Sequence, residues 1–503
     1  MDQTIDVLVI GAGPGGLTAG YLLTKNTDLS VVMVEQDPQY VGGISRTEQF
    51  EGHSFDIGGH RFFSKSAEVV ALWHELLPDG FIERPRSSRI FYGNKFYRYP
   101  LSAFEALKNL GIIESTRSML SYLFARVKPH PDPKTFHQWV ANQFGERLFS
   151  IFFKTYTEKV WGMSCDEISA DWAAQRIKGL SLSTAVWGAL KRSLGIKSGK
   201  RVVKTLIESF HYPRRGPGML WEAAARKFEG QGGQLLMGQS ARSLRYDRAA
   251  RQWTVETAGA DGQIRRFTAR HVVCTAPLRE TINAISPKPR SAAAASKLQY
   301  RDFVTVALIL DRPATFTDNW IYIHDPSVKV GRIQNFASWS PDMVPDAATG
   351  GCLGLEYFCF DGDALWESSD EALAELATSE LVKLGLATRD QIRGFRVVRQ
   401  PKAYPVYDDQ YRNIVDTIRA ELAESYPNLH LVGRNGMHKY NNQDHAMMTA
   451  MLTVDNIIAE RAIRDVWSVN EDAEYHESAE TAKSGASGLR GVPTRTAPAS
   501  VAA

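Results

Sequence analysis

Three glycines near the N-terminus have the spacing of a turn that binds phosphate. Gly11, Gly13 and Gly16 form the pattern G-x-G-x-x-G, which follows the apolar run 5–10 and precedes a helical pattern. The first glycine permits a tight bend, the second lets the backbone approach a pyrophosphate, and the third lets the helix pack on the strand. The N-terminus of that helix offers unpaired N–H groups and a partial positive charge. The pattern predicts a dinucleotide site.

An acidic residue, Glu35, ends the second apolar run at 30–35. It stands where a carboxylate would accept hydrogen bonds from ribose hydroxyls. A glycine turn used only for packing would explain the three glycines but not the acid. The two runs, the turn and Glu35 therefore predict a β–α–β unit that opens a doubly wound α/β fold.

Two further glycine-rich segments indicate which dinucleotide is bound. GGISRT at 42–47 follows the second strand, and DIGGHRF at 56–62 comes soon after it. Each glycine pair alone is typical of an ordinary turn, and a simple nicotinamide-dependent dehydrogenase needs neither. An extended FAD, whose flavin lies far from its adenine, needs several backbone contacts. HLVGR at 430–434 supplies another late in the chain, so the order of these segments predicts FAD.

Composition and periodicity divide the chain into three expected units and a tail. The predicted segments are a Rossmann-like FAD-binding domain at 1–90, 211–295 and 421–468, a mixed-sheet substrate domain at 91–102 and 296–420, a helical insertion at 103–210, and a disordered tail at 469–503. The tail is assigned because it is rich in small and polar residues and poor in large apolar ones.

The overall composition excludes several classes of protein. The 503 residues include 59 basic and 56 acidic ones, a net charge of +3, which gives no support to nucleic-acid binding. The four cysteines form no C-x-x-C pair, so we expect neither a disulfide scaffold nor a metal site. No stretch reaches the ~18 apolar residues of a membrane helix. We predict a cytoplasmic protein without a targeting signal, and peripheral contact with a membrane stays open.

The glycine motifs, with the late GR at 433–434, resemble those of the amine oxidase and protoporphyrinogen oxidase superfamily of FAD proteins. Within it the chain most resembles the UDP-galactopyranose mutases, over roughly residues 5–460. TFHQWV at 135–140, YTEKVWG at 156–162 and GRNGMHKYNNQD at 433–444 also look like that family. Arg61, Phe62 and Trp339 depart from its pattern, and the segment 180–195 does not resemble its mobile substrate loop.

The resemblance implies an isomerase whose substrate is a nucleotide sugar. In such mutases reduced FAD attacks the anomeric carbon through its N5 atom, the sugar ring opens and recloses in the other size, and no net redox change occurs. An external reductant is then needed to reduce the flavin. Arginines can clamp a diphosphate with paired hydrogen bonds, and tyrosines add neutral donors. The residues that the resemblance places in these roles are His60, Arg176, Arg332, Tyr322, Tyr404 and Tyr440.

The same resemblance extends the list of expected FAD contacts. They are Gly11, Gly13, Gly16, Glu35, Gly43, Arg46, Gly58, Gly59, Gly433, Arg434, Asn442, Gln443 and Asp444. Arg434 and Asp444 are expected at an FAD phosphate or the flavin, and Asn442 and Gln443 at the flavin pyrimidine. For these last four residues, helix capping and ion pairing are the alternative.

Two other functions stay open. A true oxidoreductase, such as an amine oxidase, a desaturase or a protoporphyrinogen oxidase-like enzyme, would share the FAD motifs but needs an apolar or aromatic cage at the flavin. A scaffold stabilised by FAD is the non-enzymatic alternative. The basic cluster of Lys191, Arg192, Lys197, Lys200, Arg201 and Lys204 is typical of a solvated loop and also suits an anionic membrane surface or a lipid-linked phosphate.

Overall fold

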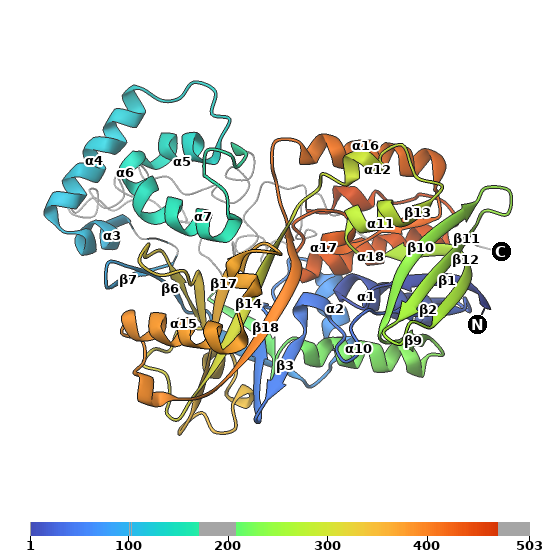
Figure 1. The fold of residues 1–503 in the computed structure, drawn as a ribbon, viewed down its shortest axis with the longest axis horizontal. Coiled ribbons are helices and arrows are strands. Elements are labelled where there is room, and N and C mark those ends of the chain that lie inside the picture. Colours follow the sequence, from blue (N-terminus) through green and yellow to red (C-terminus); the bar gives the residue numbers. More distant parts are fainter. Residues whose placement is uncertain (1, 100, 102, 171–207, 471–503) are drawn as a thin grey trace.

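Two large β-sheets, one toward each end of the molecule, organise the fold (Figure 1). The computed structural model describes residues 2–99, 101, 103–170 and 208–470. Arg176, the basic cluster, the segment 180–195 and the remainder of the predicted tail lie outside the described residues. No helix in the described ranges is long and apolar enough to cross a membrane.

The first sheet has eight strands and carries the dinucleotide turn (Figure 1). Its strands are β1 Asp2–Ile10, β2 Val31–Val34, β9 Gln234–Leu236, β10 Gln239–Asp247, β11 Gln252–Gly259, β12 Ile264–Cys274, β13 Ile285–Ser286 and β19 Leu429–Leu431. The order is β13-β10-β11-β12-β1-β2-β9. β1 pairs in parallel with β2 and β12, and β9 pairs in parallel with β2, as a β–α–β opening requires.

Both faces of this sheet are covered by helices. On β1, Val7 and Val9 enter one apolar core, whereas Leu8 and Ile10 enter the other. The first core packs against α1 Pro14–Asn26, α2 Ala67–Leu76, α10 Gly218–Gly230 and α18 Gln443–Ile458. The second packs against α11 Leu278–Ala284, α12 Ala292–Ala295 and α16 Tyr411–Ser425. A strand buried on both faces reads as a continuous apolar run, and the predicted α/β fold class is confirmed.

The long strand β12 joins the late part of the chain to the first sheet. One edge of its first half pairs with β11 in antiparallel fashion, up to Ala269. Along its last residues, Val272 to Cys274, β12 pairs in parallel with β19. The chain beyond β19 therefore emerges at the same sheet edge as the turn after β1, which brings 433–444 to the dinucleotide turn.

The second sheet has seven strands in the order β18-β14-β17-β16-β15-β6-β7. They are β6 Ser88–Tyr92, β7 Lys95–Arg98, β14 Tyr300–Leu310, β15 Trp320–Ile323, β16 Arg332–Asn335, β17 Gly351–Cys359 and β18 Ile392–Pro405. Every residue of β14 and β17 is buried. Helix α15 Asp370–Lys383 packs on one face (Figure 1), and Phe55 and Ile57, which precede the glycine pair at 58–59, pack on the other face.

A separate group of helices lies beside the second sheet (Figure 1). It consists of α3 Ala103–Leu110, α4 Ile112–Val127, α5 Phe136–Phe144, α6 Glu146–Phe149, the π-helix η2 Ser150–Lys154 and α7 Thr155–Trp161. These helices share an aromatic-rich core with Tyr97 of β7. Two short hairpin-like pairs, β3 Thr47–Phe50 with β4 His53–Asp56 and β5 Phe81–Pro85 with β8 Ser209–Pro213, connect the units.

Three expected boundaries need correction. The second sheet begins at Ser88 in β6, inside the range predicted for the FAD-binding domain. Helix α16 packs on the first sheet, so 411–420 do not belong to the substrate domain. Val469 is fully buried and Asn470 donates a hydrogen bond to the Tyr440 carbonyl at 2.9 Å, so the packed chain extends past 468. Each boundary was misplaced because composition does not reveal which sheet an element packs on.

Candidate functional site

The dinucleotide turn joins the end of β1 to the start of α1. Gly11 has a φ of +95°, and its N–H donates to the Val34 carbonyl at 2.8 Å. A Cβ added to Gly16 would lie 1.9 Å from the Gly11 oxygen, so the helix and the strand approach too closely for any side chain there. A Cβ added to Gly13 would meet nothing within 4 Å. The turn is therefore closed behind Gly16 and open beside Gly13, where a pyrophosphate would approach.

Two other predicted segments meet this turn. The Gly42 N–H donates to the Ala12 carbonyl at 2.8 Å, and a Cβ on Gly43 would lie 3.5 Å from the Gly13 Cα. A Cβ on Gly15 would lie 3.7 Å from the Gly433 Cα, at the start of the short helix α17 Gly433–Gly436. Three stretches of backbone, far apart in the sequence, thus converge at the carboxyl edge of the first sheet, where ligands of α/β sheets bind.

Glu35 is buried at the end of β2 and faces the turn. Its carboxylate accepts the Ala12 N–H at 2.7 Å and the Asp37 N–H at 2.9 Å. Burial raises the pKa of Glu35, although these backbone N–H groups oppose the shift. A carboxylate has about four acceptor positions, so two remain for ribose hydroxyls. Arg46, by contrast, is held by Glu48 at 2.9 Å and by the Gln400 side chain at 2.7 Å.

The loop that carries Gly58, Gly59 and His60 lies between the two sheets. Gly58 has a φ of +81°, and the His60 Nδ1 lies 3.1 Å from the Gly58 carbonyl. A Cβ on Gly59 would lie 3.3 Å from the Trp339 ring, which places the loop on the second sheet. Burial, with the nearby charges of Arg434 and Arg332, lowers the pKa of His60 to about 3. The imidazole is therefore neutral at physiological pH.

A row of polar side chains crosses the second sheet near His60. Tyr322 on β15 is the register partner of Arg332 on β16, which in turn is the partner of Glu356 on β17. Residues at the same register of neighbouring strands point to the same face. The Arg332 Nε donates to Glu356 at 2.7 Å, and its Nη2 donates to the Tyr404 hydroxyl at 3.0 Å. Glu356 also accepts the Gln334 amide at 2.6 Å and is fully buried.

The Arg332 guanidinium stays charged. Burial alone would lower its pKa, but Glu356 and the surrounding tyrosines hold the pKa of Arg332 well above its ordinary value. Burial raises the pKa of Tyr404, and raises that of Tyr156 on α7 well above the ordinary value. Both phenols therefore keep their protons and can donate hydrogen bonds to an anion.

Arg434 completes the cluster from the opposite side. Its guanidinium lies 5.3 Å from the centre of the Tyr404 ring and 5.0 Å from that of Tyr440, and the two rings stack with centres 5.6 Å apart. Arg434 donates to the carbonyls of Asn441 at 2.8 Å and Ala403 at 3.2 Å. Within the described ranges no carboxylate forms an ion pair with it. The site therefore holds two guanidinium groups against one carboxylate, Glu356.

The remaining predicted FAD contacts surround the N-terminus of α18. The Asn442 side chain caps this helix, and the buried Asp444 carboxylate lies 3.5 Å from the His445 Nδ1, which accepts the Asn442 N–H at 3.1 Å. The Gln443 amide nitrogen donates to the Arg61 carbonyl at 3.1 Å, whereas its oxygen is buried without a partner. A buried, unpartnered amide oxygen is a group that a bound molecule would satisfy.

The structure brings together most of the predicted residues and adds others. His60, Tyr322, Arg332, Tyr404 and Tyr440 converge, while Arg176 lies outside the described residues. Glu356 and Gln334 were not predicted from the sequence. The YTEKVWG motif was recognised, but its first residue, Tyr156, was not predicted as a site residue. An acid inside the apolar run CLGLEYFCF at 352–360 was the available signal for Glu356, since a charge in a buried strand needs a partner.

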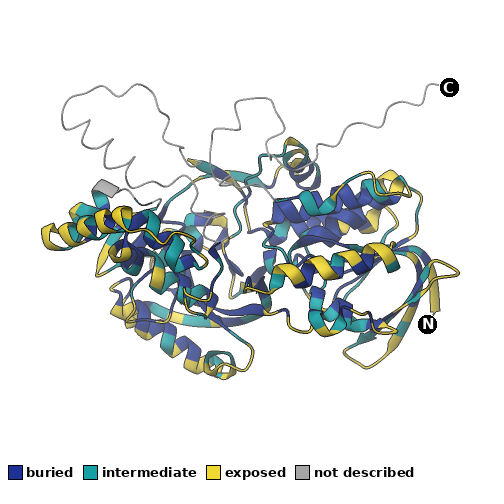
Figure 2. Ribbon diagram, turned by 90° about the horizontal axis from the view of Figure 1, so that it is seen from above, coloured by how far each residue is buried: buried dark blue, intermediate teal, exposed yellow. Residues whose placement is uncertain are grey.

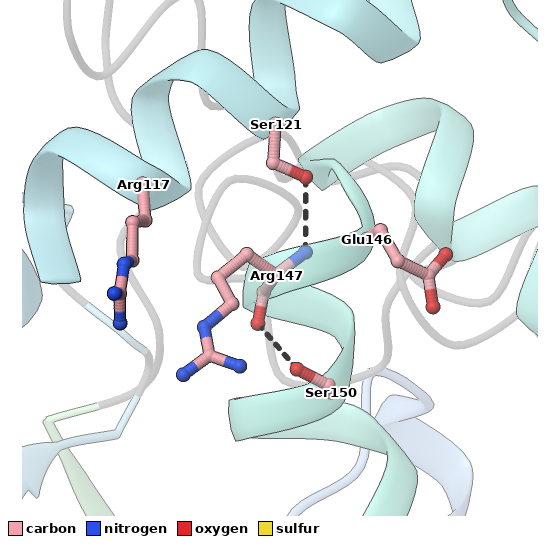
Figure 3. A pocket seen from close by; sticks show the side chains of 5 residues that line it. All are labelled: Arg117, Ser121, Glu146, Arg147 and Ser150. Carbon is pink, nitrogen blue, oxygen red and sulfur yellow. Dashed lines mark hydrogen bonds between the residues drawn. The ribbon is translucent and has the colours of Figure 1, made fainter.

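A hollow on the helical unit is separate from this site. It has a volume of about 430 Å³ and lies between α4, α6 and η2, lined by Arg117, Ser121, Glu146, Arg147 and Ser150 (Figure 3). The Arg147 guanidinium pairs with Glu114. The backbone N–H of Arg147 donates to the Ser121 hydroxyl at 3.1 Å, and the Ser150 hydroxyl donates to the Arg147 carbonyl at 2.8 Å. None of the predicted site residues lines this hollow.

Comparison with known proteins identifies the family. Residues 14–458 match the family model described as flavin containing amine oxidoreductase. The chain belongs to this family. FAD is accordingly its cofactor, the predicted FAD is confirmed, and the open side of Gly13 together with the unpartnered Gln443 oxygen fits such a ligand.

Proteins similar to this chain carry different activities. Two curated relatives named coproporphyrinogen III oxidase, from Mycobacterium leprae (strain TN) and Mycobacterium tuberculosis (strain ATCC 25618 / H37Rv), are 24% and 23% identical over 434 and 437 residues, which cover 82% of this chain and 90% of each relative.

A crystal structure of reduced UDP-galactopyranose mutase is 20% identical, with a TM-score of 0.79 over 93% of this chain and 98% of that chain. A putrescine oxidase bound to putrescine is 19% identical, with a TM-score of 0.59 over 91% of this chain and 100% of that one. At these identities the structures share the fold, and the chain is an FAD-dependent enzyme of this superfamily.

Proposed function

We propose that this flavoenzyme interconverts the pyranose and furanose forms of a nucleotide sugar. The observation that carries the proposal is the half-buried Arg332 guanidinium, which lies among tyrosines on the second sheet and close enough to His60 to depress its pKa. A diphosphate needs cationic and neutral donors of this kind, whereas a hydride-abstracting site needs an apolar cage.

The described residues divide the work between them. Arg332 and the hydroxyls of Tyr156, Tyr322 and Tyr404 would bind the diphosphate oxygens. Glu356 holds the Arg332 guanidinium by its Nε and so fixes the direction of the remaining N–H groups. Arg176 is expected to add a second cationic donor.

The charge of the site also favours an anionic ligand. Arg332 is balanced by Glu356, but Arg434 has only carbonyl acceptors and two aromatic rings around it. Removing a guanidinium from water without a counter-charge is unfavourable, so an anion beside Arg434 would stabilise the folded protein. When bound in its reduced form, FAD supplies the nucleophile for the sugar. Neutral His60, whose Nδ1–H donates to the Gly58 carbonyl, can accept one hydrogen bond at Nε2.

A second function is favoured by the curated relatives. A coproporphyrinogen oxidase would use the same FAD fold, and the propionate groups of its substrate would also be attracted by Arg332 and Arg434. Trp320 and Trp339, whose rings stack with centres 5.3 Å apart near Gly59, could form one wall of an aromatic cage. The two functions differ in the flavin state required, because the mutase needs reduced FAD and the oxidase needs oxidised FAD and oxygen.

The decisive experiment offers both substrates to the purified holoenzyme. The flavin is reduced with dithionite under nitrogen, a panel of UDP- and GDP-sugars is added, and the products are separated by chromatography. We expect a furanose product with the reduced enzyme and none with the oxidised one. Absence of conversion, together with oxygen-dependent formation of fluorescent porphyrin from coproporphyrinogen III, would instead assign the oxidase.

Variants then test the proposed residues. Tyr322→Phe should raise the KM for the nucleotide sugar by about tenfold, since one donor to the diphosphate is lost. Tyr246→Phe, on β10 of the other sheet, is the matched control and should leave KM unchanged. Equal effects of the two substitutions would contradict the placement of the diphosphate.

A further inference from the structure

Helix α4 exposes large apolar side chains along most of its length. Of the ten large apolar residues that are exposed in the described chain, six lie on this one helix. They are Ile112 (88% exposed), Ile113 (72%), Leu120 (62%), Leu123 (52%), Phe124 (67%) and Val127 (86%). Single exposed apolar residues are ordinary on protein surfaces, but a contiguous row of them marks an interaction surface.

The six residues form one face of the helix. At 3.6 residues per turn, Ile113, Leu120, Phe124 and Val127 fall within an arc of about 60°, and all six within about 120°. The opposite face is the one that packs: Ser118 and Tyr122 are buried there, against the junction of α5 and α6 at Gly145. The apolar arc is therefore not turned toward the helical core.

The position of α4 leaves this arc accessible. The helix lies at the outer edge of the helical unit, at the end of the molecule away from the first sheet (Figure 1). Exposed residues recur along the whole of α4, and only Ser118 and Tyr122 on it are buried (Figure 2).

Basic residues border the apolar arc on both sides. By the same helical spacing, Arg117 and Lys128 lie beyond one margin and Arg126 lies beyond the other. All three are exposed. The one acid of the helix, Glu114, is 21% exposed and pairs with Arg147 of α6 and, at 3.8 Å, with Arg117, so Arg126 and Lys128 are the basic residues without an acid on the helix. The outward surface of α4 is therefore apolar along its centre, positively charged at its margins and free of acidic groups.

We propose that α4 docks this enzyme on the surface of an anionic lipid bilayer. An amphipathic helix with a large apolar face and Lys and Arg at its borders lies in the plane of the interface, with its apolar side chains among the acyl chains. The long basic side chains reach the lipid phosphates from the margins. The helix is too short and too polar on its inner face to span the bilayer, so the contact is peripheral. This proposal does not depend on the reaction proposed above.

A second copy of the chain fits this surface less well. Two copies that pack through the same arc would place the margins of Arg117 and Arg126 against each other, with no acid on that face to pair with them. Like charges brought together in this way oppose association. Lipid phosphates supply the negative charge that another α4 lacks.

Flotation of lipid vesicles with the full-length holoenzyme tests the proposal. Phosphatidylcholine vesicles are compared with vesicles in which about a third of the lipid is phosphatidylglycerol. We expect at least about tenfold more enzyme to float with the anionic vesicles, and this excess to fall as salt is added. The triple variant Leu120→Ser, Phe124→Ser, Val127→Ser should reduce the bound fraction on anionic vesicles about tenfold or more while keeping its bound flavin.

A matched control removes three exposed apolar residues elsewhere. Ile264, Val382 and Ile463 lie on other elements, and their joint replacement by serine should leave vesicle binding unchanged. Replacement of Arg117, Arg126 and Lys128 by glutamine should weaken binding to anionic vesicles and flatten its salt dependence.

Three outcomes would overturn the proposal. The first is that the wild-type enzyme stays with the aqueous fraction on anionic vesicles at low salt. The second is that the apolar triple variant binds as tightly as wild type, which would assign the attraction to basic groups elsewhere. The third is a concentration-dependent dimer in sedimentation experiments that the triple variant abolishes, which would make the arc an interface between copies of the chain.

Discussion

The FAD turn and the cluster of side chains around Arg332 are built on opposite principles. Around the FAD turn, the surface is formed by backbone atoms. The glycines at the ends of the strands have no side chains, so backbone segments can approach one another and the cofactor closely. Around Arg332, it presents side chains from β15, β16, β17 and β18 that charge and hydrogen bonding hold together. One region is limited by space and the other by electrostatics.

This difference decides what each region tolerates. At Gly16 an added methyl group would collide with the Gly11 carbonyl, whatever its chemistry. At Arg332 the volume matters less than the charge, because the removal of the guanidinium would leave the buried Glu356 carboxylate without its counter-charge, with only the Gln334 amide as a donor. Substitutions in the two regions should therefore fail in different ways.

The largest effect is expected at the glycine turn. Gly16→Val forces a side chain into a space 1.9 Å from the Gly11 oxygen, which should cost about 3 kcal/mol or more and yield protein without flavin absorbance. Gly13→Ala is the comparison variant that tests cofactor binding without strain in the fold. Gly13 has a φ of −77°, which alanine adopts, and nothing lies within 4 Å of an added Cβ.

Circular dichroism and flavin absorbance separate these two variants. We expect the Gly13 variant to fold like wild type but to bind FAD more weakly, because only the cofactor would meet the new methyl group. A Gly13 variant with unchanged FAD content would place the pyrophosphate elsewhere.

The second prediction concerns the ion pair on the second sheet. Arg332→Met should lower the free energy of unfolding by about 3–5 kcal/mol, because it strands the fully buried Glu356 carboxylate. The same substitution at Arg290, which pairs with Glu424 at the surface, should cost less than about 1 kcal/mol. Chemical denaturation measures both, and equal costs would show that Glu356 is not dependent on its partner.

The third prediction is a pH dependence that arises where the two regions meet. Asp56 on β4 is fully buried; it accepts hydrogen bonds from Tyr212 and, at 3.0 Å, from Thr47, and burial raises its pKa to about 7. The folded state thus binds a proton that the unfolded chain releases near pH 4. The stability contributed by this proton is present below about pH 4 and is lost as the pH rises toward 7, a loss of the order of 4 kcal/mol.

Asp56→Asn removes that loss. The free energy of unfolding of this variant minus that of wild type should therefore increase from pH 4 to pH 7, as measured by chemical denaturation at a series of pH values. Tyr212→Phe deletes a hydrogen bond to the carboxylate and should make the pH dependence steeper or shift it upward. A parallel pH profile for wild type and the asparagine variant would assign the titration to other groups.

The smallest effect is expected at Tyr404. Its hydroxyl accepts one hydrogen bond from Arg332 at 3.0 Å, so Tyr404→Phe should cost about 1 kcal/mol of stability. The ring itself stays stacked on Tyr440. Thermal unfolding of this variant beside Tyr246→Phe measures the difference, and a loss as large as that of Arg332→Met would show that the hydroxyl, and not Glu356, holds the guanidinium.

Much of the fold was readable from the sequence where the burial of a segment is complete. The runs at 5–10 and 30–35 became β1 and β2 because a central parallel strand needs apolar residues on both faces. The boundaries at 90, 420 and 468 were wrong because the local sequences of β6, α16 and Val469 do not indicate which part of the fold they pack against. For the site, the residue types were predictable, but the pairing of Arg332 with Glu356 was not, since these residues lie on strands whose register only folding sets.

What the sequence by itself determined is the cofactor region. A glycine turn, the acid after the next strand and the later glycine segments act through local backbone geometry. Residues that are consecutive in the chain determine that geometry. Only the tertiary structure decided how the charges around Arg332 are balanced and which face of α4 is exposed. Both depend on long-range contacts. Residues distant in the chain decide whether a charge gains a counter-charge and whether an apolar surface is covered.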